Sequence, residues 1–315
     1  MKLSYYGYSF TEFSKSKRPS AIDLLKICKN FCNHFSPEIK NLLKNNGENQ
    51  YLVHQGGNLF LFIQTRSQEL IKKIDAKSIS VSEIYDSLEE DENIGFASYV
   101  YIDNLYMCFG STLMAPKIKS FIDFINSILD LHQITNYRFS VTPFLSQTTP
   151  TEIKKAHFIG RTTLKISKDN SFANEIKEFF GGESSYYEDI DSFEIIIRPK
   201  LRKDISKAIT QVVDKASTDK GVEKFIIAAK KEEDERLTDY YLSGRGLVSD
   251  YIDVKKEKNV ESAIKSKIEH NGELLESIGN YEKTLSKVQI AAITDLHRES
   301  TWTKLNLRLS SANQA

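Results

Sequence analysis

Two runs of basic side chains are the residues best suited to chemistry in this sequence, and that chemistry is the binding of phosphate groups. Residues 154–168 contain five cations and no acid, and residues 198–207 contain five cations with Asp204 as their one acid. Lysine and arginine side chains attract phosphate oxygens and donate hydrogen bonds to them. The sequence therefore predicts a polyanion-binding surface formed by Lys154, Lys155, Arg161, Lys165, Lys168, Arg198, Lys200, Arg202, Lys203 and Lys207.

The segment 157–163 adds other groups that suit phosphate oxygens. We expect Gly160 to loosen its backbone and Arg161 to present a guanidinium. The hydroxyls of Thr162 and Thr163 would supply further hydrogen bonds. Arg245, in the loop Ser243–Gly246, completes the predicted DNA-binding set.

The net charge of the chain does not reveal that basic and acidic residues are concentrated in separate segments. The chain of 315 residues has 43 basic and 43 acidic side chains, so its formal net charge is zero, which argues against a uniformly basic coat protein. The segment Asp75–Glu92, however, carries seven acids and one lysine. A neutral chain sorted in this way can bind a polyanion through one face, although the alternative for each run is an ordinary solvated surface.

The elements that must position these residues indicate an α+β fold of two lobes with mixed or antiparallel sheets, followed by a helical C-terminal region. Residues 1–145 are predicted to form an N-terminal α+β domain. Residues 146–245 are predicted to form the basic α+β domain, in which strands at Thr162–Ser167 and Phe193–Ile197 alternate with helices over 172–180 and 203–216. After Thr218 the charged sequence predicts mainly helix, and residues 246–315 are assigned to the helical C-terminal region.

Other chemistry is less well supported by the sequence. It contains no phosphate-binding loop, dinucleotide fingerprint, zinc-protease motif or nucleophile elbow. The pair Cys28 and Cys32 lacks a second pair to complete a metal site. Glu152-Ile153-Lys154 and Glu175-Ile176-Lys177 match only the short part of a nuclease motif. We therefore expect no enzyme activity, no cofactor and no metal, and a metal-dependent nuclease stays as an alternative.

Cellular location is inferred from what the sequence lacks. Three cysteines in a long chain do not suggest a disulfide framework, which fits a reducing cytoplasm. The first ten residues do not form a signal peptide. The most apolar stretch, 95–115, is interrupted by Asp103-Asn104 and predicts two strands rather than a membrane span. Any link to a membrane would therefore come through a partner.

The same basic segments resemble those of the RexA family of phage lambda exclusion proteins. The resemblance covers most of the chain in order, in five segments: Tyr51–Phe62, Ser87–Phe96, His157–Lys165, Ile196–Ile205 and Leu237–Ser243. The chain is also broadly similar to KwaB, the second component of the Kiwa anti-phage system. These segments identify a family more firmly than a mechanism.

The resemblance implies a cytoplasmic homodimer that binds double-stranded DNA without strong sequence preference. It further implies a role in anti-phage defence with a multi-span membrane partner (RexB or KwaA in the two systems), peripheral attachment to the inner membrane through that partner, and contacts with phage proteins. Because no sequence-reading motif is present, DNA binding would rest on phosphates. A protein-binding regulator, whose basic face docks an acidic protein, remains the second alternative.

Overall fold

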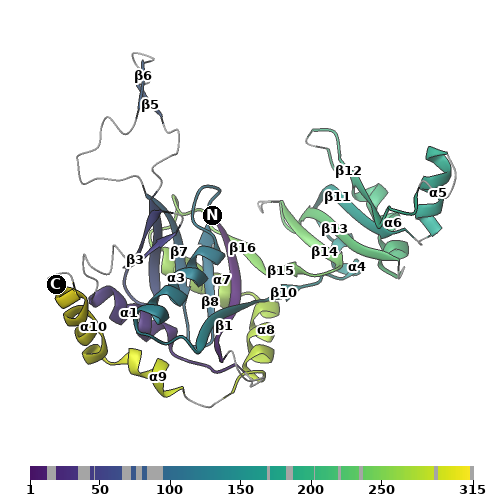
Figure 1. The fold of residues 1–315 in the computed structure, drawn as a ribbon. Helices are drawn as coiled ribbons and strands as arrows, with labels where there is room; N and C mark the ends of the chain where they lie inside the picture. Colours follow the sequence, from purple (N-terminus) through teal and green to yellow (C-terminus); the bar gives the residue numbers. More distant parts are fainter. Residues whose placement is uncertain are drawn as a thin grey trace. The chain divides into compact units, whose positions relative to one another are not determined.

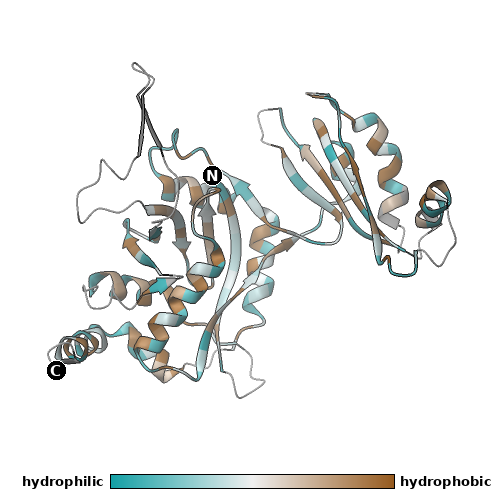
Figure 2. Cartoon of the chain, turned by 45° about the horizontal axis from the view of Figure 1, so that its top comes forward, coloured by the Kyte–Doolittle hydropathy of each residue, from teal (hydrophilic) through white to brown (hydrophobic). Residues whose placement is uncertain are grey.

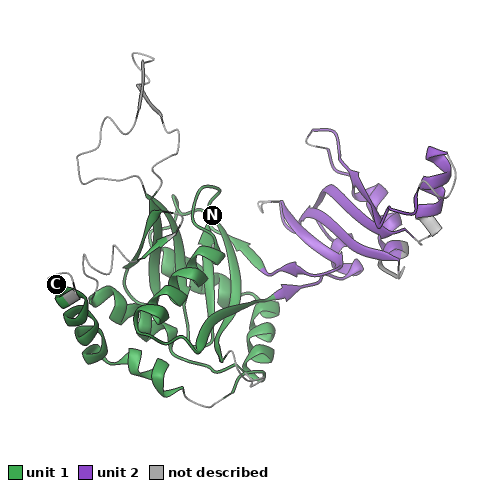
Figure 3. Cartoon of the chain, in the orientation of Figure 1, with its two compact units in different colours: residues 1–144, 249–315 green, residues 145–248 purple. Residues whose placement is uncertain are grey.

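The computed structural model divides the chain into two compact units (Figure 3). Unit 1 comprises residues 1–144 and 249–315, and unit 2 comprises residues 145–248. Unit 2 is therefore inserted between two parts of unit 1. The structure describes residues 1–12, 19–34, 43–45, 47–65, 72–75, 80–83, 95–168, 171–181, 187–201, 203–218, 221–233, 237–286 and 290–312.

Unit 1 is built on an antiparallel sheet (Figure 1). Its strand order is β16-β1-β8-β7-β4-β3-β2, and β9 pairs with the second half of the long β1. The strands are β1 (Lys2–Glu12), β2 (Lys44–Asn45), β3 (Glu48–His54), β4 (Leu59–Thr65), β7 (Gly95–Ile102), β8 (Tyr106–Ser111), β9 (Tyr137–Pro143) and β16 (Ser249–Tyr251); a separate hairpin consists of β5 (Lys72–Asp75) and β6 (Ser80–Glu83).

Aromatic side chains join the helices of unit 1 to its sheet. The helices are α1 (Leu24–Asn33), α3 (Ile118–Leu131), α7 (Val260–Glu269), α8 (Gly272–Glu282), α9 (Ala291–Thr294), the short 3-10 helix η3 (Asp295–His297) and α10 (Glu299–Ala312). Phe62 of the sheet packs against Phe121 and Phe124 of α3, and Phe124 packs on Phe31 of α1. Phe31 in turn contacts Trp302 of α10, so the C-terminal helix belongs to the core of unit 1.

Unit 2 contains a second antiparallel sheet, in the order β12-β11-β13-β14. Its elements are β10 (Leu145–Ser146), α4 (Pro150–Lys154), β11 (Phe158–Ser167), α5 (Ser171–Phe180), β12 (Ser192–Ile197), α6 (Ser206–Thr218), β13 (Val222–Lys230), β14 (Thr238–Ser243) and β15 (Gly246–Leu247). Ile209 and Val213, four residues apart and therefore on one face of α6, are buried in one hydrophobic cluster with Phe225 and Ile227 of β13. Hydrophobic and hydrophilic residues are mixed along the helices of both units, as this packing requires (Figure 2).

The architecture confirms the predicted α+β class with antiparallel sheets and C-terminal helices. The segment 95–115 forms the strand pair β7–β8, as expected. The prediction of mainly helix after Thr218 is wrong, because β13 and β14 follow there before the C-terminal helices begin. Residues 249–315 pack with residues 1–144 in unit 1, whereas residues 246–248 belong to unit 2.

Candidate nucleic-acid interface

Strand pairing determines which of the predicted basic residues come together. Thr162 of β11 pairs with Ile197 of β12, and Phe158 pairs with Lys230 of β13. In an antiparallel sheet the start of one strand lies beside the end of its neighbour. The start of β11 and the ends of β12 and β13 therefore meet at one end of the sheet, with Arg161 in β11 and Arg198 directly after the neighbouring β12.

The start of α6 lies at the same end because two hydrogen bonds tie it to β11. The backbone N–H of Ile159 donates to Oδ1 of Asp204 at 2.8 Å, and the N–H of Ile205 donates to the carbonyl of Ile159 at 3.0 Å. The segment between β12 and α6 is thus fixed against β11. We call this surface the basic end and define it by Lys155, His157, Arg161, Arg198, Lys200, Lys203 and Lys207.

Asp204 is the one acid within the second basic run, and its carboxylate has a structural role as a hydrogen-bond acceptor. Its Oδ1 also accepts from the N–H and the hydroxyl of Ser206, at 3.1 and 2.5 Å. Burial alone would raise the pKa of Asp204, but the hydrogen bonds from Ser206 and from the backbone of Ile159 outweigh it, and its pKa is lowered. The carboxylate therefore stays charged and accepts two hydrogen bonds from Ser206, the first residue of α6.

Five cations of the basic end are exposed and have no ion-pair partner among the residues that the structure describes: Lys155, Arg198, Lys200, Lys203 and Lys207. By contrast, Arg161 lies 3.5 Å from Asp239, and Lys154 binds Asp214 across α4 and α6. A cation without a protein partner can bind an anionic ligand without first breaking an ion pair within the protein.

Several predicted residues do not join this surface. Lys165 lies further along β11, 2.7 Å from Glu223 and in register with Glu194. Lys168 follows the far end of β11, where its N–H donates to the carbonyl of Asp191. Arg245 follows β14, whose last residue, Ser243, pairs with Phe225 near the start of β13, so it too lies at the far end. Arg202 lies outside the described residues.

The strand predicted at Thr162–Ser167 begins earlier, at Phe158, so the segment expected to be loosened by Gly160 lies within β11. Thr162 is 2% exposed and Thr163 is 8% exposed, so their hydroxyls are buried and are removed from the predicted phosphate contacts. Gly160 serves packing instead: a Cβ there would lie 3.3 Å from the carbonyl of Ala228 and from Leu237. The strand shifts register at this point, between Ile159 and Thr162.

The residues considered for metal chemistry have structural roles. Thr149 and Glu152 form a capping box at the start of α4, and the backbone hydrogen bond from Thr149 lowers the pKa of Glu152. Burial raises the pKa of Cys32 to about 12, and its thiol donates to the carbonyl of Leu52. Across the described parts of the chain, no three His, Cys, Asp or Glu side chains are grouped so as to hold a metal ion.

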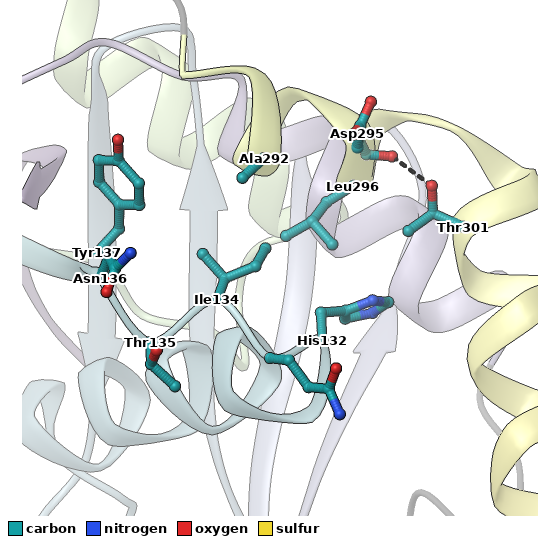
Figure 4. A pocket seen from close by; sticks show the side chains of 10 residues that line it. His132, Ile134, Thr135, Asn136, Tyr137, Ala292, Asp295, Leu296 and Thr301 are labelled. Carbon is teal, nitrogen blue, oxygen red and sulfur yellow. Dashed lines mark hydrogen bonds between the residues drawn. The ribbon is translucent and has the colours of Figure 1, made fainter.

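Unit 1 contains a pocket that the sequence did not suggest (Figure 4). Its volume is about 400 Å³, and its lining is His132, Gln133, Ile134, Thr135, Asn136, Tyr137, Ala292, Asp295, Leu296 and Thr301. Burial, with a smaller contribution from Arg308, lowers the pKa of His132 to about 4, so its ring is neutral at pH 7. Its Nε2 atom is buried and has no hydrogen-bond partner among the described residues, so a ligand in the pocket could reach it only after rearrangement.

None of the helices in the part of the chain that the structure describes is long and apolar enough to cross a membrane.

Comparison with known proteins identifies relatives over most of the chain. Residues 1–237 match the model of a family described as RexA, intracellular sensor of lambda phage and Abi component. The chain is 30% identical over 204 residues to the rexA protein of Escherichia phage lambda, covering 64% of this chain and 72% of the relative. The rexA protein of Enterobacteria phage 434 gives the same identity and coverage. These matches confirm the family resemblance that the sequence segments predicted.

Proposed function

Because the chain belongs to the RexA family, we propose that it acts in phage exclusion by binding duplex DNA through the basic end of unit 2. Family membership supports the role in anti-phage defence. The observation that carries the DNA assignment is the gathering of five exposed cations at one end of the sheet, from the end of α4, the segment after β12 and α6, none of which has an ion-pair partner among the described residues.

Binding at this surface is expected to depend on phosphates rather than on bases. A protein that neutralises phosphates releases condensed counterions, and the logarithm of its affinity falls by roughly 0.9 for each contact per decade of salt. Five phosphate contacts by one chain therefore give a slope of about −4.5 when the logarithm of the binding constant is plotted against the logarithm of the salt concentration. The described parts of unit 2 present no helix–turn–helix arrangement to enter a major groove, so sequence should matter little.

The proposal includes the partners that the family resemblance implies. A homodimer would carry two basic ends and bind DNA with about twice the salt slope. A multi-span membrane protein would receive the signal, holding the dimer at the inner membrane, and phage proteins are further candidate partners. Sedimentation of the purified chain at micromolar concentration tests the dimer. The likeness to KwaB stays a prediction.

The test of DNA binding is fluorescence anisotropy with labelled duplexes of unrelated sequence across a salt series. Arg198→Glu combined with Lys203→Glu should weaken binding at least about tenfold at moderate salt and reduce the slope by about 2. The matched control is Lys168→Glu combined with Arg245→Glu, which makes the same charge change at the far end of the sheet and should leave affinity within about twofold. Circular dichroism establishes that both variants fold.

Other outcomes would support the alternatives. Equal losses in the two double variants would contradict a localised basic end. Absence of duplex binding at low salt would overturn the proposal and favour the protein-binding regulator. Cleavage of plasmid by the purified chain with Mg²⁺ would favour the nuclease; we expect the plasmid to stay intact.

A further inference from the structure

The basic end contains one large apolar side chain that projects into solvent. Leu201 is 89% exposed, the highest exposure of any large hydrophobic residue in the part of the chain that is described. It lies in a tight turn, closed by a hydrogen bond of 2.9 Å from the N–H of Lys203 to the carbonyl of Lys200. Arg198, Lys200 and Lys203 surround it in the sequence, and all three are exposed.

This turn is held on both sides. Pro199, whose φ is fixed by its ring, and the end of β12 precede it. Asp204, bound to the N–H of Ile159, follows it. The turn that carries Leu201 is therefore short and anchored, which suits insertion of its side chain into a ligand better than a long loop does.

Other exposed hydrophobic residues of unit 2 lie in different surroundings. Phe179 and Phe180 end α5, where the exposed acids Glu175 and Glu178 would repel phosphates. Ile196 and Ile197 are about half as exposed as Leu201 and lie within β12. Among the described residues of unit 2, only Leu201 combines such high exposure with cations within two positions and no acid there.

We propose that Leu201 is a wedge that enters the minor groove and inserts between two base pairs, kinking the duplex. This inference rests on the proposed DNA binding and specifies its mode. Proteins that kink DNA from the minor groove push an apolar side chain into a base step while nearby cations hold the two phosphate backbones. Arg198, Lys200 and Lys203 would hold the backbones here.

The wedge has consequences for the choice of DNA. Partial unstacking costs less where the stack is already weakened, so a duplex with a central mismatch should bind more tightly than a matched one. Flexible pyrimidine–purine steps should be favoured over stiff A-tracts. Specificity would come from deformability and not from contacts with base edges.

The experiment uses the full chain and duplexes of about 30 base pairs, labelled at both ends for energy transfer. Saturating wild-type protein should bring the ends together, and a central mismatch should raise affinity about tenfold. Leu201→Ala should abolish both effects while affinity for the matched duplex falls by less than about tenfold. Leu201→Met should preserve them, because it keeps an apolar side chain of similar volume.

Leu113→Ala is the matched control. Leu113 is 88% exposed, lies in a loop of unit 1 and has a lysine, Lys117, bound to its carbonyl at 3.1 Å. This variant should bend DNA as the wild type does. Equal bending by Leu201→Ala and Leu113→Ala would overturn the wedge.

The remaining outcomes separate this inference from the proposed function. Binding of duplex by the wild type without any bending refutes the wedge and leaves DNA binding intact. Failure of the wild type to bind duplex refutes both. A Leu201-dependent attachment to phosphatidylglycerol vesicles, with DNA bending unchanged in Leu201→Ala, would assign this turn to a membrane surface instead and overturn the wedge.

Discussion

Oδ1 of Asp204 accepts a hydrogen bond of 2.8 Å from the backbone N–H of Ile159, 45 residues earlier in the chain. A second hydrogen bond runs in the opposite direction: the N–H of Ile205, the residue after Asp204, donates to the carbonyl of Ile159. Together the two bonds join the start of β11 to the start of α6. These bonds bring Lys155, Arg198, Lys200, Lys203 and Lys207 to one surface, because the carboxylate of Asp204 binds the backbone at the start of β11.

Asp204→Ala should lower the free energy of unfolding of unit 2 by about 1–3 kcal/mol, because it leaves the N–H of Ile159 and the start of α6 without their acceptor. Asp204→Asn should cost less, since an amide oxygen still accepts. Urea unfolding of both variants measures the difference. Asp239→Ala, which removes only the exposed partner of Arg161, is the control and should cost no more than about 1 kcal/mol. Equal effects of the two Asp204 variants would contradict the assigned role.

His132 should make the stability of unit 1 sensitive to mild acid. Its pKa in the folded state is about 4, below the ordinary value of 6.5, because burial disfavours the charged ring. Between these values the unfolded chain binds a proton that the folded chain does not, so stability falls as pH decreases from about 6.5 to about 4, by at most about 1.4 kcal/mol per pH unit.

The measurement for this prediction is the melting temperature of wild type and His132→Phe between pH 7.5 and pH 4.5, with both limits set roughly to bracket the titration. The wild type should lose more stability than the variant as pH falls. His297, whose pKa burial also lowers, contributes equally to both proteins. Parallel curves would show that His132 is not a neutral buried group.

Trp302→Ala should destabilise unit 1 by about 3–5 kcal/mol. The indole is 1% exposed, packs on Phe31 and His132, and donates its N–H to the carbonyl of Leu296 at 2.8 Å. Leu307→Ala is a suitable control, because Leu307 lies on the same helix and is 65% exposed; its cost should stay within about 0.5 kcal/mol. Urea denaturation followed by circular dichroism measures the free energy of unfolding of both variants. A small effect of Trp302→Ala would mean that α10 does not belong to the core.

The sequence predicted the α+β class and both basic runs, since hydrophobic periodicity and charge are local properties. It did not predict the burial of Thr162 and Thr163, which depends on which face of β11 is covered and on the register shift at Gly160. It also missed β13, because the apolar run Phe225–Ala229 is short and flanked by charged residues. The partner of Asp204 could not be predicted from spacing, because the bond crosses two strands and a helix.

The order in which the two units can fold during synthesis follows from the insertion. Unit 2 is one continuous stretch, and all its strands are available once residue 248 has left the ribosome. Strand β1 is made before unit 2, yet it pairs with β16, and Trp302, which is also made after unit 2, is buried in the core of unit 1. Domains generally fold as units as they emerge. The inserted unit can therefore be complete before β16 and Trp302 are made, so a chain stalled at that point would contain a finished unit 2 and an unfinished unit 1.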